Sequence, residues 1–171
     1  LNMMRAFAEL AAFEINRDVE AKKVADEVRA RINMVMGDQL FSIVYQPIVD
    51  IGTGRPVGLE CLSRFHSGRP DGWFAEAANV GMGVALELAA INKALLALSR
   101  FPEHVYLAVN ASPESILHGG LVEIMRELPG YRLVVEVTEH ATVEDYDAVR
   151  AALKPLRDRG VSIAIDAAGA G

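Results

Sequence analysis

The chain has 171 residues, of which 51% are hydrophobic and 23% are charged, and its formal net charge at pH 7 is −6. This composition is typical of a soluble globular domain with one core, and no apolar run approaches the ~18 residues that a membrane span needs. The acidic balance argues against a polynucleotide partner, which would need a basic face, but permits a small anionic ligand held by a metal ion or local arginines. The single cysteine, Cys61, excludes an internal disulfide and favours a reducing cytoplasm.

Residues 1–39 are predicted to form one long helix, because they contain no proline and no glycine before Gly37. Their apolar residues recur in steps of mostly three and four, which predicts a single stripe of helical period. These residues are Met4, Ala8, Ala11, Ile15, Val19, Val24, Val28, Ile32 and Val35. Two interpretations stay open: a helix packed on its own domain, or a parallel coiled-coil linker that carries a signal from an upstream sensor. Since the first residue is Leu1, we expect the chain to begin inside a longer protein.

From Phe41 onward, short apolar strands alternate with helical segments. The predicted strands are 41–49, 56–65, 104–110, 132–138 and 161–166, and the predicted helices are about 83–99, 113–128 and 143–158. Ser112 before Pro113 predicts a helix start, and Thr142 with Asp145 resembles a capping box. Strands alternating with helices imply parallel βα units, either in a TIM-type barrel or in an open doubly wound sheet. We therefore predict a helical linker at residues 1–39 and an α/β domain at residues 40–171.

Oxygen-bearing side chains lie toward the C-terminal ends of four successive strands. They are Glu60, Asn110, Glu136 and Asp166. Barrel active sites are built at this end of parallel strands, and buried carboxylates need partners such as a divalent cation. The all-oxygen set favours Mg²⁺ or Mn²⁺ over zinc. The alternative is that these residues only cap the following helices, but four in succession favour a metal site. Such a site suits hydrolysis or transfer at a phosphoester, and it could also serve an enolising lyase.

Five short motifs occur in order over residues 41–171. They are Tyr45-Gln46-Pro47-Ile48-Val49-Asp50 followed by Thr53-Gly54, Glu60-Cys61-Leu62-Ser63-Arg64-Phe65, Val109-Asn110-Ala111-Ser112, Glu136-Val137-Thr138-Glu139, and Ile165-Asp166-Ala167-Ala168-Gly169-Ala170-Gly171. Together they resemble the EAL family of bacterial cyclic-di-GMP phosphodiesterases, with Cys61 in place of the alanine of the E-A-L signature. Residues 1–39 lie outside this resemblance and are similar to the exit helix of a GAF sensor domain.

The resemblance implies a TIM-like (β/α) barrel of EAL type with an antiparallel first strand, incomplete here at about five strands and preceded by a long helix. It implies binding of cyclic di-GMP and its hydrolysis to pGpG with two Mg²⁺ or Mn²⁺ ions. The implied metal ligands are Glu60, Asn110, Glu136 and Asp166, of which Glu60 and Asp166 are also catalytic. Gln46 and Arg64 would bind substrate, with the guanidinium of Arg64 at a phosphate. Glu139 would anchor the loop that follows the fifth strand.

Two departures from the family pattern lead us to expect impaired catalysis. Ala167 replaces the second aspartate of the family's D-D loop, and loss of a carboxylate from a two-metal site costs orders of magnitude in rate. The sequence also stops at Gly171, whereas a complete barrel has roughly 250 residues and eight strands, so we expect a C-terminal part to follow.

Two functions are therefore expected as alternatives. The first is a metal-dependent cyclic-di-GMP phosphodiesterase domain of a bacterial signalling protein, impaired by Ala167 and by the missing part. The second is a catalytically inactive EAL module that acts as a cyclic-di-GMP receptor or signal relay. In either case we expect an upstream sensor domain, a cytoplasmic location, and a homodimer formed through the N-terminal helix or the barrel as one possible assembly.

Overall fold

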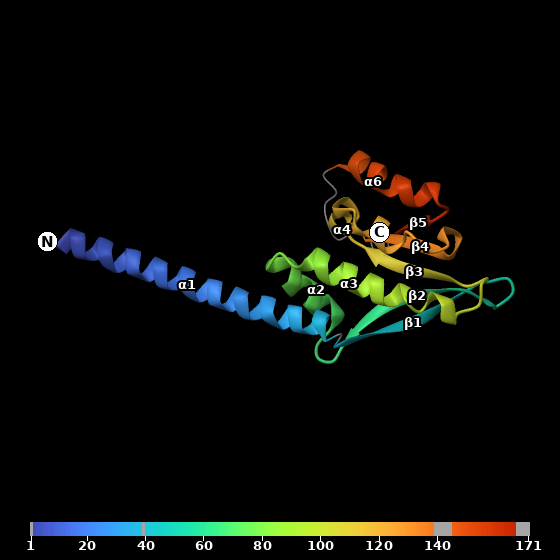
Figure 1. The fold of residues 1–171 in the computed structure, drawn as a ribbon. Helices are drawn as coiled ribbons and strands as arrows, with labels where there is room; N and C mark the ends of the chain where they lie inside the picture. The colour runs from blue at the N-terminus through green and yellow to red at the C-terminus, as the bar shows by residue number, and fades with distance from the viewer. Residues whose placement is uncertain (1, 39, 139–144, 167–171) are drawn as a thin grey trace.

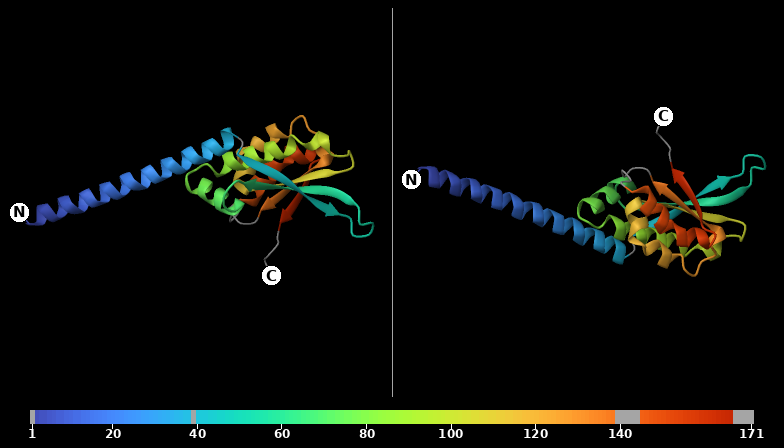
Figure 2. Two further views of the ribbon diagram at one scale, coloured as in Figure 1. Left: turned by 90° about the horizontal axis from the view of Figure 1, so that it is seen from below. Right: turned by 90° about the horizontal axis from the view of Figure 1, so that it is seen from above.

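The structure, a computed structural model, describes residues 2–38, 40–138 and 145–166, with side chains from Phe13 to Ile165. A long helix, α1 (Asn2–Gly37), extends away from an α/β body (Figures 1 and 2). The strands are β1 (Phe41–Val49), β2 (Pro56–Phe65), β3 (Tyr106–Ala111), β4 (Leu133–Thr138) and β5 (Ser162–Asp166). The helices are α2 (Pro70–Asn79), α3 (Gly83–Leu95), α4 (Pro113–His118), α5 (Gly120–Ile124) and α6 (Tyr146–Asp158), with 3-10 turns η1 (Leu98–Arg100) and η2 (Gly130–Arg132).

The five strands form one sheet in the order β1-β2-β3-β4-β5, and the sheet is not closed into a barrel. β1 pairs antiparallel with β2, whereas β2, β3, β4 and β5 run parallel to their neighbours. The predicted βα alternation and the antiparallel first strand are therefore confirmed. Each predicted strand lies within two residues of the observed one at both ends.

The helices depart further from the prediction. α2 was not predicted, although Pro70 at its first position is a helix-start signal. The helix expected at 113–128 is two short ones, because Gly119 ends α4 in the left-handed region at φ 83°. The cap of α6 is Asp145, whose carboxylate accepts the N–H of Ala148 at 2.9 Å, and Thr142, where a capping box was expected, lies outside the described residues. The expected cap at Ser112 is confirmed.

The main core lies between one face of the sheet and helices α3 to α6. Strand residues with odd numbers, such as Cys61, Leu107 and Val135, belong to this core and are nearly or fully buried. Because side chains alternate along a strand, residues with even numbers lie on the opposite face. The sheet therefore has one face covered by helices and a second face that is free to carry polar side chains.

Gly58 and Tyr106 are neighbours on that second face. The two residues are paired in register across β2 and β3, and a Cβ added to Gly58 would lie 2.3 Å from the Tyr106 ring. Only glycine leaves room for the ring at this point, so Tyr106 lies directly against the backbone of β2. Tyr106 comes two residues before Ala108 on β3, so its ring lies on the same face of the sheet as Glu60 and Ala108.

Among the residues of α1 whose side chains are described, those near its C-terminal end contact the body, where Ile32 and Val35 are 0% and 5% exposed. Ile15 and Val19 are 62% and 61% exposed, and the single predicted stripe is wrong. The step from Val19 to Val24 spans five residues, which turns the helix by about 140° beyond a full turn. The apolar residues before and after this step therefore lie on different faces of α1.

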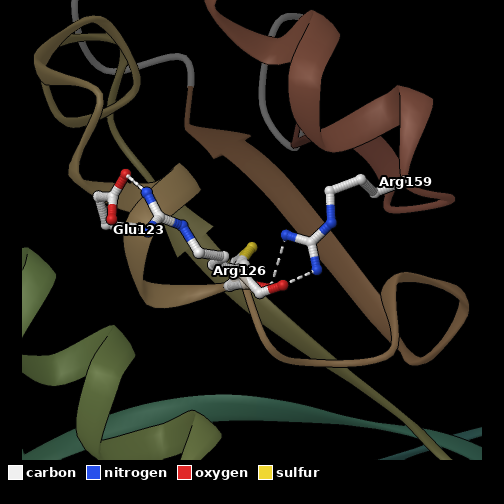
Figure 3. A network of polar contacts seen from close by, with 4 residues as sticks. Glu123, Arg126 and Arg159 are labelled. Carbon is white, nitrogen blue, oxygen red and sulfur yellow. Dashed lines mark hydrogen bonds and ion pairs between the residues drawn. The ribbon is translucent and has the colours of Figure 1, made fainter.

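Two arginines join the loops at the N-terminal ends of the parallel strands. Arg132 is buried and donates to the carbonyl oxygens of four residues at 2.9 to 3.2 Å. These residues are Leu98, Phe101, Pro102 and Val105. Arg159, just after α6, donates to backbone carbonyls of Met125, Arg126 and Leu128, and Arg126 itself pairs with Glu123 at the surface (Figure 3).

We predict that Arg132→Met lowers the free energy of unfolding by about 3 kcal/mol, because it leaves several buried carbonyl groups without their charged donor. Urea denaturation of the purified protein measures this change. Arg126→Met is the matched control, since it removes only an exposed ion pair and should cost less than about 1 kcal/mol. Equal effects of the two substitutions would contradict the structural role of Arg132.

Candidate functional site

The register of the sheet brings the predicted site residues to the face that is not covered by helices. Gln46 of β1 pairs with Glu60 of β2, which pairs in turn with Ala108 of β3. One step further along β3, Asn110 pairs with Glu136 of β4. Residues that are paired in register project to the same face, and so do residues two apart on one strand. The glutamates and the asparagine therefore share one face.

Glu60 and Asn110 are in direct contact, since the Asn110 side-chain amide donates to Oε1 of Glu60 at 3.2 Å. Both side chains are half-buried, as is Glu136. Burial raises the pKa of the Cys61 thiol to about 12, and the charges of Glu60 and Glu136 add to this effect. The two carboxylates are thus close enough to the same buried thiol to act on it together.

Alanine lies beside each glutamate on this face. Ala108 is the neighbour of Glu60 on β3, and Ala164 is the neighbour of Glu136 on β5. A methyl group leaves space above the sheet that a larger side chain would fill. The carboxylates are therefore lined by small residues on one side, with Tyr106 lower down on the same face.

The donor set fits a hard divalent cation. Glu60, Asn110 and Glu136 offer only oxygen ligands, which Mg²⁺ and Mn²⁺ prefer. Among the side chains that the structure describes, no three His, Cys, Asp or Glu residues converge tightly enough to hold a metal ion. Asp166 would be the third carboxylate. Its backbone ends β5 opposite Thr138, two residues after Ala164, and its side chain lies outside the described part of the chain.

The two expected substrate residues, Gln46 and Arg64, are exposed on the same face as Glu60. Gln46 is exposed beside Glu60, on β1. Arg64 is exposed on the same strand as Glu60, four residues further along, and its Nη1 donates to the carbonyl of Ser63 at 2.8 Å. Glu139 and Ala167 lie outside the described residues.

Part of the first motif has a structural role. Asp50 Oδ1 accepts the backbone N–H of Thr53 at 2.8 Å and its hydroxyl at 2.7 Å, and Gly54 follows with φ 66°. These bonds lower the pKa of the Asp50 carboxyl, with the hydroxyl of Thr53 as the largest cause. Asp50, Thr53 and Gly54 therefore shape the turn between β1 and β2 and lie outside the polar face.

One residue near the site was missed by the sequence analysis. Glu87 of α3 accepts the N–H of Ser112 at 2.7 Å and its hydroxyl at 3.1 Å, immediately after β3. Burial raises the pKa of the Glu87 carboxyl, and hydrogen bonding from Ser112 and Ser115 opposes that rise. The position of Glu87 in the sequence could have indicated this role. It lies one helical turn before the buried Ala90 and Ile91, and it is the one charged residue on the apolar face of α3 that contains them.

The chain belongs to the EAL domain family, whose pattern matches residues 29–171. Uncharacterized protein y4lL of Sinorhizobium fredii is 31% identical over 138 residues, which are 74% of this chain and 17% of that protein. The chain therefore spans less than a fifth of the length of this relative.

Two solved structures are similar to the body of the chain. The c-di-GMP complex of PaMucR phosphodiesterase is 30% identical with a TM-score of 0.68, and the match covers 77% of this chain and 61% of that one. Klebsiella pneumoniae BlrP1, in a complex with calcium and cyclic di-GMP, is 29% identical with a TM-score of 0.66, and the match covers 78% of this chain and 36% of that one. A second solved structure of BlrP1 is a complex with manganese and cyclic di-GMP. The TIM-like fold and the use of divalent metals in the family follow from these neighbours.

No helix within the described residues has the length and apolar character of a membrane span. The expected cytoplasmic location stays a prediction.

We predict that the Cys61 thiol of the folded protein does not react with an aromatic disulfide reagent at pH 8. Its pKa of about 12 keeps it protonated there, and it is buried on the helix side of the sheet. Absorbance of the released thiolate measures the reaction, and unfolding in urea should make the thiol reactive because its pKa returns toward 9.0. Rapid reaction of the native protein would contradict this placement of Cys61.

Proposed function

We propose that the chain is part of an EAL phosphodiesterase domain that binds cyclic di-GMP and takes part in its metal-dependent hydrolysis to pGpG. The observation that carries the proposal is the contact of Asn110 with Glu60 on a face where Glu136 lies in register with Asn110. The cyclic-di-GMP complexes of the similar structures support the ligand. Mg²⁺ or Mn²⁺ is proposed as the cofactor, because every donor on this face is an oxygen.

Glu60, Asn110, Glu136 and Asp166 would hold the metal ions. A bound pair of such ions supplies a hydroxide nucleophile and neutralises charge on the phosphate. Glu60 and Asp166 are the proposed catalytic residues within this set. Gln46 would line the substrate groove, a role supported by its pairing with Glu60 across the edge strand β1. The guanidinium of Arg64 would leave the carbonyl of Ser63 and bind a phosphate of the substrate, and Glu139 would anchor the loop that follows β5.

The alternative is an inactive receptor or signal-relay module, and two observations favour it. Ala167 offers no side-chain oxygen where the family pattern has a second aspartate. In addition, α1 is joined to the end of β2 by stacked side chains. Arg31 of α1 lies over Trp73 at 5.1 Å, and Trp73 stacks on Phe65 at 5.0 Å, directly after Arg64. A shift of α1 would therefore move the end of β2, which carries Arg64, the proposed substrate-binding residue.

We predict that Glu60→Gln, Asn110→Ala and Glu136→Gln each weaken Mn²⁺ binding and lower the turnover of cyclic di-GMP in the full-length protein. Each substitution removes a proposed ligand oxygen or its charge, which should cost at least about tenfold in metal affinity. Titration calorimetry with Mn²⁺ and chromatography of pGpG measure the two effects. Glu103→Gln is the control, since Glu103 is exposed before β3, at the other end of the strand from Asn110.

Ala167→Asp separates the two functions. A gain in pGpG formation in this variant indicates a phosphodiesterase weakened by Ala167. Binding of cyclic di-GMP with no turnover in either form indicates a receptor. Absence of metal and cyclic-di-GMP binding in the unsubstituted protein would reject the phosphodiesterase and the receptor.

We also propose that the outer part of α1 pairs with a second copy of the chain and follows an upstream sensor domain. Ile15 and Val19 lie on a face that does not dock on the body, and both are largely exposed. Their spacing of four residues places them on one side of the helix, as in a coiled-coil seam.

We predict that Ile15→Glu combined with Val19→Glu shifts a dimer toward monomer, because each copy would bring a charge into the apolar seam. Sedimentation velocity at several protein concentrations measures the change. Arg17→Glu is the matched control, since Arg17 lies between the two on another face and is also exposed. If the double variant keeps the oligomeric state of the unsubstituted chain, pairing through this face of α1 is rejected.

A further inference from the structure

Glu87 is a half-buried carboxylate with no part in the proposed chemistry. It lies on α3, which covers the opposite face of the sheet from Glu60 and Asn110. One of its oxygens, Oε1, accepts both the backbone N–H and the hydroxyl of Ser112. The Ser112 hydroxyl in turn accepts the N–H of Ser115, so its donor and acceptor directions are both fixed.

Ser112 is two residues from Asn110, and β3 ends between them at Ala111. Beyond that point, the Ser112 N–H has no partner on β4 and takes Glu87 instead. The anchor from α3 therefore fixes the backbone where β3 leaves the sheet. The position of this backbone sets where the Asn110 amide lies relative to Glu60, which it contacts at 3.2 Å.

We propose that Glu87 is a positioning residue for the metal site: through Ser112 it holds the end of β3, so that Asn110 and Glu60 are presented together. This inference rests on the proposed function, because it assumes that Asn110 is a metal ligand. A purely structural role for Glu87 would lower stability and leave the metal affinity of the folded protein unchanged. A positioning role lowers the affinity, and does so only while Asn110 is present.

Because Ser112 makes both hydrogen bonds to one oxygen of Glu87, two conservative substitutions of Glu87 should have different effects on metal affinity. Glu87→Gln keeps an oxygen at the same reach, which can accept both donors of Ser112, so it should retain most of the metal affinity. Glu87→Asp keeps the charge but shortens the side chain, so it should lose affinity. Reach, and not charge, is therefore the property that matters at this position.

The test is a double-substitution cycle on Mn²⁺ affinity, measured by titration calorimetry with the metal alone on the full-length protein, well below the melting temperature of every variant. Glu87→Ala and Glu87→Asp are expected to weaken binding by about 10- to 100-fold, the range for residues that orient metal ligands. In an Asn110→Ala background, Glu87→Ala should cause no further loss. Ile91→Ala is the control: it removes a buried apolar side chain from the same helix and takes away no hydrogen bond of the anchor. This substitution should leave the affinity unchanged.

The outcomes distinguish a failure of the proposed function from a failure of the positioning role of Glu87. If the unsubstituted protein binds no Mn²⁺, or if Asn110→Ala does not weaken binding, the proposed function fails and the positioning role fails with it. If Asn110→Ala weakens binding but Glu87→Asp and Glu87→Ala do not, only the positioning role is overturned. Fully additive losses in the double variant overturn it as well, because they show that Glu87 acts on the metal independently of Asn110. Should Glu87→Ala fail to fold, Glu87→Asp and Glu87→Gln decide the question.

Discussion

The register of the parallel strands constrains both faces of this sheet at once. Because successive side chains alternate, a shift of β3 by one residue would turn Asn110 toward the helices and bring Val109 to the polar face. The buried partners of Val109, among them Cys61 and Val135, oppose such a shift. The apolar core on one side of the sheet thus fixes the arrangement of Glu60, Asn110 and Glu136 on the other. The hydrogen bond between Glu60 and Asn110 is a consequence of that packing.

Much of this arrangement could be predicted from the sequence, because strands with period-two alternation leave a strong signal. β1 and β2 were predicted with their observed limits, and the shared face of Glu60, Asn110 and Glu136 follows from their positions in the strands. What could not be predicted has a physical reason in each case. The step of five residues from Val19 to Val24 lies within a series of otherwise helical spacing, so the apolar residues of α1 were predicted to share one face although they occupy two. A polar residue on an apolar helix stripe has no meaning until its partner is known, and Ser112 is 25 residues from Glu87.

The motifs that resemble the EAL family divide into chemical and architectural parts once the contacts are known. Asp50, Thr53 and Gly54 shape a tight turn, and Ser112 caps α4 while it is held by Glu87. Glu60 and Asn110 meet on the polar face. A motif of four to eight residues can therefore carry a ligand and the means of fixing it in place. This explains why such motifs are longer than the number of ligands requires.

Trp73 is the single tryptophan of the chain, and it lies at the junction between α1 and the end of β2. Its ring stacks on Phe65, a guanidinium from α1 lies over it, and its indole N–H donates to the carbonyl of Ser67 at 2.6 Å. Indole fluorescence responds to polarity and to nearby charge. The tryptophan emission of this chain therefore comes from one place, and displacement of the helix would change its wavelength or intensity with no added label. The molecule carries its own optical reporter at the joint where a signal from upstream would have to pass.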